Sequence, residues 1–136
     1  MSLIPPVLAL IGWTFVMWVW LYATRIPAMR AARIDLEAVS RMGAKVDLPP
    51  EVSRVADNYN HLHEQPTLFY ALALAAQLAN AVDGVSVALA WTYVALRVIH
   101  SFVQATRNVI IARFSVFAAA SLVLLLLLLR TVLLLV

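Results

Sequence analysis

The sequence predicts an all-α integral membrane protein, a four-helix bundle formed by one domain over residues 1–136. Three observations predict this class. Apolar and aromatic residues make up 64% of the chain and charged residues only 12%, and the mean hydropathy is +0.91. Soluble domains are nearer half apolar and a quarter charged. The apolar residues also form four runs, each long enough to cross about 30 Å of hydrocarbon as a helix.

The first predicted span covers residues 3–22, which carry no charge. It ends in Trp18, Trp20 and Tyr22, an aromatic cluster typical of a headgroup interface. A signal peptide is the competing interpretation. The run lacks a basic n-region, is too long for an h-region, and has no small-residue cleavage site after it. We therefore expect a span.

The remaining spans are predicted at residues 61–82, 85–104 and 114–136. Asp83-Gly84 separates the second span from the third and is a tight-turn signal. Arg130 interrupts the last run near its end, where a long basic side chain can snorkel to the interface.

The main hydrophilic segment is the connection over residues 24–60. Its first part has mixed charge and helix-forming residues, so the first helix can continue beyond the membrane. Leu48-Pro49-Pro50 stops any helix at that point. A new helix should start near Glu51, whose negative charge suits a helix N-terminus.

The basic residues predict the orientation. Between the first two spans lie Arg25, Arg30, Arg33, Arg41, Lys45 and Arg54. Arg107 and Arg113 lie between the last two spans, whereas the other connection carries only Asp83. By the positive-inside rule, the two basic connections are cytoplasmic and both termini lie outside. The net charge of +3 and the pI near 9.8 are therefore interpreted as a topology signal, and no nucleic-acid partner is expected.

Polar residues inside the spans are costly and indicate function or pairing. Span three carries them on one helical stripe: Tyr93, Arg97, His100, Gln104 and Arg107. On span two, Asp57, His61 and Glu64 share a face. We expect Glu64 to pair with Arg97. The pair either fastens two helices or also lines a ligand cavity.

Cysteine and histidine limit the chemistry. The chain has no cysteine, which excludes disulfides, thiolate metal sites and cysteine nucleophiles, so any thiol must come with a ligand. His61 and His63 cannot share one helical face. His61, Glu64 and His100 could converge, but no further ligand has metal-site spacing, and we expect no metal. His100 is predicted to be a hydrogen-bonded packing residue rather than a base.

These residues also carry a resemblance that covers nearly the whole chain. It rests on His61-x-x-Glu64-x-Pro66, Leu68-Phe69-Tyr70, Tyr93-x-x-x-Arg97-x-x-His100 and Arg113 at the start of the last span. Together with the four spans and the long first connection, the pattern resembles the MAPEG family, the membrane-associated proteins in eicosanoid and glutathione metabolism. We expect a bacterial member, located in the inner membrane.

The resemblance implies a homotrimer with glutathione sites between subunits, open to the cytoplasm. Members of the family conjugate glutathione to lipophilic electrophiles, reduce lipid hydroperoxides or isomerise an endoperoxide. One member is a non-catalytic lipid-binding helper. Glutathione is therefore the expected co-substrate, and a lipid or other lipophilic molecule arriving from the bilayer is the expected second substrate.

The resemblance also implies roles for particular residues. Arg30, Glu64 and Arg97 fall where the family holds the glutathione peptide, and Arg113 falls where an arginine stabilises the thiolate. Arg107 adds a cation at the cytoplasmic mouth.

The chain departs from the family pattern at three positions. His61 replaces an asparagine, Gln104 replaces a tyrosine that contacts glutathione, and Phe114 replaces a serine of the prostaglandin-forming branch.

Three functions remain open. The first is a glutathione-dependent transferase or peroxidase acting on lipophilic electrophiles or lipid hydroperoxides. The second is a non-catalytic lipid-binding or scaffold trimer of the same family. The third is a small proton-coupled exporter with Glu64 as its proton carrier. Four-span exporters place the key carboxylate in the first span and have short loops, which disfavours the third function here.

Overall fold

The computed structural model describes residues 1–34, 37, 39, 41 and 48–136. Within these ranges the structure is helical and contains no strand, so the predicted all-α class is confirmed. Its helices are α1 (Ile4–Ala31), α3 (Pro50–His61), α4 (Gln65–Leu78), α5 (Gly84–Ala105) and α6 (Ile110–Leu135). Three of them, α1, α5 and α6, are long and apolar enough to cross a membrane.

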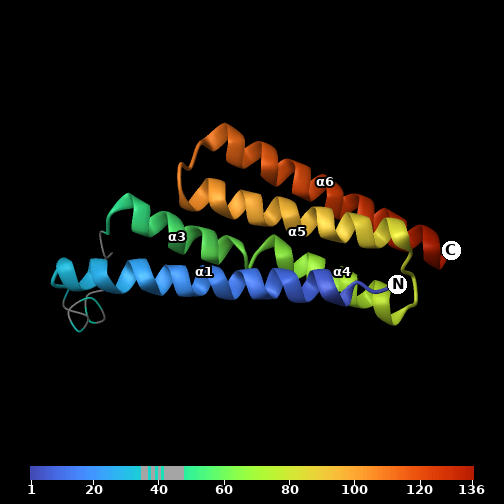
Figure 1. Ribbon diagram of the computed structural model, residues 1–136, viewed down its shortest axis with the longest axis horizontal. Helices are drawn as coiled ribbons and strands as arrows, with labels where there is room; N and C mark the ends of the chain where they lie inside the picture. Colours follow the sequence, from blue (N-terminus) through green and yellow to red (C-terminus); the bar gives the residue numbers. More distant parts are fainter. Residues whose placement is uncertain (35–36, 38, 40, 42–47) are drawn as a thin grey trace.

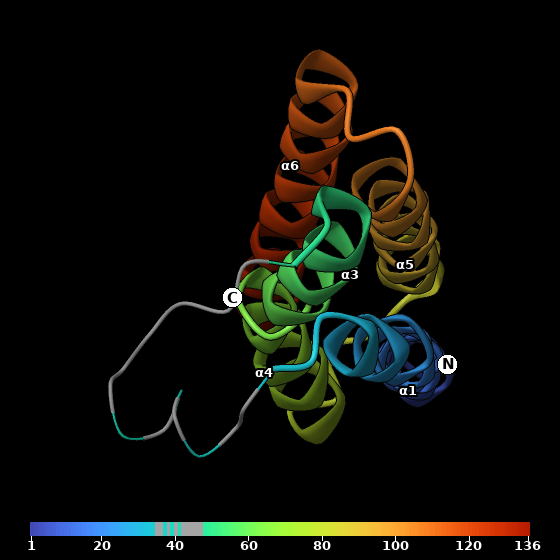
Figure 2. The same ribbon diagram turned by 90° about the vertical axis from the view of Figure 1, so that its left-hand side faces the viewer.

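The helices run back and forth along one long axis (Figure 1). Helices α3 and α4 follow each other along a single traverse, and α6 packs mainly on α5. Figure 2 shows α3 between α1, α5 and α6 when the bundle is viewed from one end. Both termini lie at one end of the bundle, and the α5–α6 connection lies at the other (Figure 1).

Helix α1 begins with two prolines, Pro5 and Pro6, which fit the first turn because its N–H groups have no helical partner. It continues to Ala31, well past the expected interface near Tyr22. Its 28 residues correspond to about 42 Å. The helix is therefore longer than the hydrocarbon, and its basic end extends beyond it, as the sequence predicts.

Helix α3 begins at Pro50, next to the predicted start at Glu51, and this prediction is confirmed. Pro49 has an extended backbone with φ −50° and ψ 142°, which places Pro50 at the first helical position. Glu51 lies in the first turn, at the positive end of the helix.

The second expected span, residues 61–82, is not one helix. Helix α3 ends at His61, and α4 runs from Gln65 for only 14 residues, about 21 Å. The break has a local cause. In a continuous helix Pro66 would have no N–H to donate to the Leu62 carbonyl, and its ring would clash with that carbonyl. Tight turns close the gap, with the N–H of Glu64 donating to the His61 carbonyl at 3.4 Å.

Helix α5 starts at the predicted turn. Asp83 caps it by accepting hydrogen bonds from the Ser86 N–H at 2.8 Å and the Ser86 hydroxyl at 2.9 Å. Arg130 of α6 donates to the other carboxylate oxygen, with its Nε at 3.1 Å. The Arg130 guanidinium holds the pKa of Asp83 well below its ordinary range. Arg130 thus has a carboxylate partner, in addition to the interface position that the sequence predicts for it.

The interior combines stacked aromatic rings with small residues. Phe69 stacks on Tyr93 with centroids 4.7 Å apart, and the fully buried positions include Ala73, Ala76 and Ala90. The outer faces are apolar as well, with Phe15 64% exposed and Leu133 70% exposed. An outer surface of this kind suits lipid rather than water, so the protein is an integral membrane helix bundle.

Candidate functional site

A cavity of about 310 Å³ lies between the end of α3, the C-terminal half of α5 and the first turns of α6. Its lining residues are His61, His100, Gln104, Ile110, Arg113, Phe114 and Phe117. Three of the predicted site residues, His61, Gln104 and Arg113, therefore share one cavity. Glu64 and Arg97 are bonded to His61, as described below.

Arg113 lies in the first turn of α6 because the helix begins at Ile110. Its Nη1 donates to Oδ1 of Asn108 at 2.9 Å. Asn108 has a φ of 50°, a left-handed conformation that asparagine tolerates better than most residues. The guanidinium and the positive end of α6 both attract negative charge to the cavity.

His61 is the last residue of α3, and its ring is bonded to a carboxylate. Nδ1 of His61 lies 2.8 Å from Oε2 of Glu64. The His61 side chain is 24% exposed and the Glu64 side chain 66% exposed. The two residues therefore form a carboxylate–imidazole pair that borders the cavity and remains open to solvent.

The predicted pairing of Glu64 with Arg97 is wrong. Among the residues that the structure describes, Glu64 forms its ion pair with His61, and Arg97 forms none. Arg97 is fully buried and donates from Nη2 to the His61 carbonyl at 3.0 Å. This carbonyl belongs to the last turn of α3, where the helix dipole is negative and attracts cations. The end of a helix takes the place of the expected carboxylate.

Several buried polar atoms near the cavity have no hydrogen-bond partner within the described ranges. They are Nε and Nη1 of Arg97, Nδ1 of His100 and Oε1 of Gln104. His100 is buried, as predicted, but its Nδ1 lacks the expected partner. An unsatisfied buried polar group costs about 1–3 kcal/mol, so these atoms favour a polar ligand or water in the cavity.

The His100 ring connects the cavity walls. Its centroid lies 5.0 Å from that of His61 and 6.0 Å from that of Phe117. The sequence analysis gave His100 a packing role and missed Phe117, although both residues line the cavity. The signal was available, because Phe117 follows Arg113 by one helical turn and so lies on the same face of α6.

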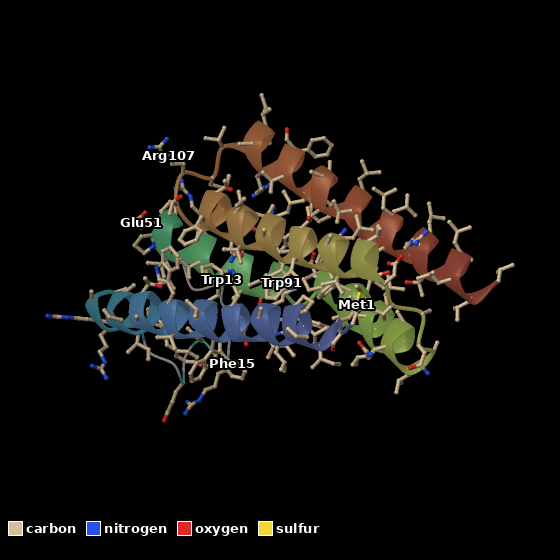
Figure 3. The ribbon with its side chains drawn as sticks, turned by 45° about the vertical axis from the view of Figure 1, so that its right-hand side comes forward. Met1, Trp13, Phe15, Glu51, Trp91 and Arg107 are labelled. Atoms are coloured by element: carbon tan, nitrogen blue, oxygen red, sulfur yellow. The ribbon has the colours of Figure 1, made fainter. Side chains whose placement is uncertain are left out.

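Two predicted site residues lie elsewhere. Arg107 borders a separate hollow with Phe102 and Ala112, and Arg30 borders another with Met29 and Arg33. Figure 3 shows Arg107 at the α5–α6 connection, at the end of the bundle where Glu51 begins α3. One chain alone therefore does not bring all of the predicted cations to the cavity.

Phe114, the third departure from the family pattern, lines the cavity. The nearby Ser115 cannot replace the missing serine in a simple way, because its hydroxyl donates to the Ile111 carbonyl at 2.9 Å.

An apolar groove of about 360 Å³ lies between α4 and α6, one turn along α6 from the cavity. Its lining residues are Gln65, Leu68, Leu72, Ser121, Leu124, Leu125 and Leu128. Gln65 donates to the Ser121 hydroxyl at 2.7 Å. Leucine side chains make up most of the groove's lining, which suits a hydrocarbon chain.

A further cavity of about 200 Å³ lies between α1, α3 and α4 and includes none of the predicted site residues. Across the part of the chain that the structure describes, no three histidine or acidic side chains form a group that could hold a metal ion.

Comparison with known proteins identifies one family. The family model described as the MAPEG family matches residues 3–133. Comparisons with curated proteins and with solved structures give no significant match. Because the family model covers nearly all of the 136 residues, and because the helices and the cavity fit a membrane bundle, this chain belongs to the MAPEG family.

Proposed function

We propose that this protein is a glutathione-dependent membrane enzyme of the transferase or peroxidase type, acting on lipophilic electrophiles or lipid hydroperoxides. The observation that carries the proposal is the position of Arg113. Its guanidinium and the N-terminus of α6 border the same cavity as His61 and Gln104. A free thiol with a pKa near 8.5 is mostly protonated at neutral pH, and a nearby cation favours the thiolate.

The polar groups around the cavity suit glutathione, which has two carboxylates and one ammonium group. Glu64 is largely exposed beside His61 and can accept the ammonium group. Among the described residues that line the cavity, Arg113 is the only arginine. Arg30 and Arg107 lie outside this cavity, so we propose that a neighbouring copy supplies the further cations, as in a homotrimer.

The apolar groove between α4 and α6 suits the second substrate. A lipophilic molecule can enter it from the bilayer and place its reactive end near Phe117, beside Arg113. Such a route keeps the hydrocarbon among leucines while the glutathione peptide stays at the polar end of the bundle.

In a conjugation, the thiolate sulfur forms a bond with an electrophilic carbon, and the leaving group departs with its bonding electron pair. In a peroxide reduction, the sulfur takes the terminal oxygen of the hydroperoxide and an alcohol is released. A second glutathione thiol then forms the disulfide and releases water. Both reactions begin with the thiolate that Arg113 stabilises.

The alternative is a non-catalytic lipid-binding or scaffold trimer. Two observations favour it. Gln104 lacks the phenol that contacts glutathione in the enzymes that this chain resembles, and one Arg113 nitrogen already donates to Asn108. The leucine-lined groove would serve lipid binding equally well.

We also propose that both termini lie outside and that the cavity opens to the cytoplasm. The support is the charge distribution together with the common position of the termini at the end of the bundle opposite the α5–α6 connection (Figure 1).

The experiment is a titration of the purified protein in detergent with glutathione, followed by thiolate absorbance and by turnover of a lipophilic electrophile. An enzyme gives a saturable thiolate signal and conjugate. A lipid-binding protein retains lipid through purification and gives neither.

A further inference from the structure

We propose that His61 accepts the proton of the glutathione thiol and that Glu64 is its positioning residue. The inference rests on the proposed glutathione function. In that function Arg113 stabilises the thiolate, and His61 is the group that takes the thiol proton. Four observations support this role.

The first observation is the bond between His61 and Glu64. With Oε2 of Glu64 at 2.8 Å, Nδ1 of the neutral imidazole carries the hydrogen and donates it to the carboxylate. The lone pair is then on Nε2, the nitrogen that a base uses. A carboxylate in this position also stabilises the imidazolium after proton transfer.

The second observation is the position of the ring. The His61 side chain is neither sealed in the core nor fully exposed, and it lines the cavity together with Arg113. A thiol held between the two side chains has a base on one side and a cation on the other. The two roles are complementary, because one removes the proton and the other stabilises the charge that remains.

The third observation is the rigid backbone under the ring. Arg97 donates to the His61 carbonyl at 3.0 Å, and the N–H of Glu64 donates to the same carbonyl at 3.4 Å. The end of α3 is therefore held in place by the buried guanidinium and by the turn before α4. A catalytic group needs such support to keep its orientation.

The fourth observation concerns the charges around the ring. From α5, the His100 ring packs on the His61 ring and Arg97 donates to the His61 carbonyl, while from α6 Arg113 lines the same cavity. Within the described ranges, Glu64 is the carboxylate that contacts the ring, so the base depends on it. His100 is a poorer base because it is 1% exposed and has no carboxylate partner there.

The proposed step is balanced. The S–H bond of glutathione breaks, and its proton forms an N–H bond at Nε2 of neutral His61. The products are a thiolate beside Arg113 and an imidazolium beside Glu64. When the thiolate has attacked the electrophile, the imidazolium returns its proton to the product or to water, and the base is restored.

The test is the rate of thiolate formation after rapid mixing with glutathione, measured across pH for the full-length protein in detergent. His61→Asn removes the base and keeps a polar side chain. We expect it to slow thiolate formation by about 100-fold, within the range of general-base catalysis. The fall in rate at low pH, where an imidazole is protonated, should disappear. The thiolate signal finally reached at high pH should remain, because Arg113 is unchanged.

Two further variants complete the experiment. Glu64→Gln alters an exposed side chain and, at saturating glutathione, should slow thiolate formation by less than His61→Asn does, because the base remains but loses the carboxylate that orients it. His63→Asn is the matched control, because His63 is exposed and its Nδ1 bonds the Tyr59 carbonyl at 2.9 Å. His63 borders the separate cavity of about 200 Å³ between α1, α3 and α4 rather than the candidate site. It should behave as wild type.

The outcomes separate the two proposals. If wild type forms thiolate and His61→Asn does so at the same rate with the same pH profile, the role of His61 is overturned and the proposed function stands. If His61→Asn does not fold, a Glu64→Gln rate equal to wild type overturns the role in the same way. If wild type forms no thiolate, both proposals fail.

Discussion

Arg113→Ala should remove most of the thiolate that forms at neutral pH, while Arg107→Ala should not. Both variants delete one positive charge near the α5–α6 connection. Only Arg113 lines the cavity, whereas Arg107 borders a different hollow and lies at the tip of the connection (Figure 3). The two variants therefore distinguish the effect of a charge next to the sulfur on the thiol pKa from the effect of the overall positive charge at this end of the molecule.

The magnitude follows from the position of Arg113. Two unit charges about 4 Å apart attract by about 4 kcal/mol at an effective dielectric of about 20. One pKa unit corresponds to about 1.4 kcal/mol, so this attraction would lower the thiol pKa by about three units. The bond to Asn108 and water at the open side of the cavity reduce the effect to about one or two units. For a free thiol pKa near 8.5, a shift of one or two units raises the thiolate at pH 7 from about 3% to about 24–76%, so thiolate should fall about 8-fold to 25-fold in Arg113→Ala.

The assay is a pH titration of thiolate absorbance with saturating glutathione, together with calorimetric binding. Arg113→Lys should also lose most of the thiolate signal. A guanidinium can bond Asn108 through one nitrogen and face the sulfur with another, whereas a lysine ammonium has a single nitrogen. Arg107→Ala should keep the thiol pKa and weaken binding by less than about 10-fold. An unchanged thiol pKa in Arg113→Ala would show that Arg113 does not stabilise the thiolate.

Three other predictions follow from the geometry. In a double-mutant cycle of Glu64→Gln and Arg97→Met, the coupling in unfolding free energy should stay below about 1 kcal/mol, because the two side chains are not in contact. A coupling of about 3–5 kcal/mol would show that Glu64 and Arg97 are directly paired after all. The pKa of Asp83 is lowered in the folded state, so its contribution to stability is present above the ordinary carboxyl pKa and is lost as the pH falls below it. Wild type should therefore lose more thermal stability than Asp83→Asn between about pH 5 and 3. Equal losses would contradict this. In this cysteine-free chain, Val136→Cys but not Glu51→Cys should react with an impermeant thiol reagent added outside intact cells, and the reverse pattern would invert the topology.

Much of the fold could be predicted because the bilayer imposes simple requirements. A span needs an apolar run of fixed length, and connections need turn residues such as Asp83-Gly84. Pro49 and Pro50 mark the start of α3 because proline has no N–H to donate within a helix. These signals are local, and each can be identified without knowledge of the partner helix.

The break after His61 could not be placed in the same way. The predicted polar face through Asp57, His61 and Glu64 requires one continuous helix. Helix α3 ends at His61, so the helical periodicity does not extend to Glu64. Glu64 then bonds back to His61, and Arg97 meets a helix end rather than a carboxylate. Which partner satisfies a buried cation depends on where a helix ends in space, and the sequence pattern alone does not contain that information.

The candidate site was predicted in part. Arg113, Gln104 and His61 share the cavity because they lie on stripes of α5 and α6 and at the end of α3, and such stripes follow from helical periodicity. Arg30 was assigned only through the family resemblance. It lies on the basic end of α1, outside the cavity of a single chain. Its contribution depends on how copies assemble, which no single-chain pattern can determine.

The most direct test of the central claim is an experimental structure of the wild-type protein with glutathione bound. We expect the sulfur atom in the cavity between α3, α5 and α6, within hydrogen-bond distance of the Arg113 guanidinium and facing the His61 ring. The peptide should extend toward Glu64. Glutathione bound elsewhere, or a lipid chain filling this cavity at saturating glutathione, would contradict the proposed site.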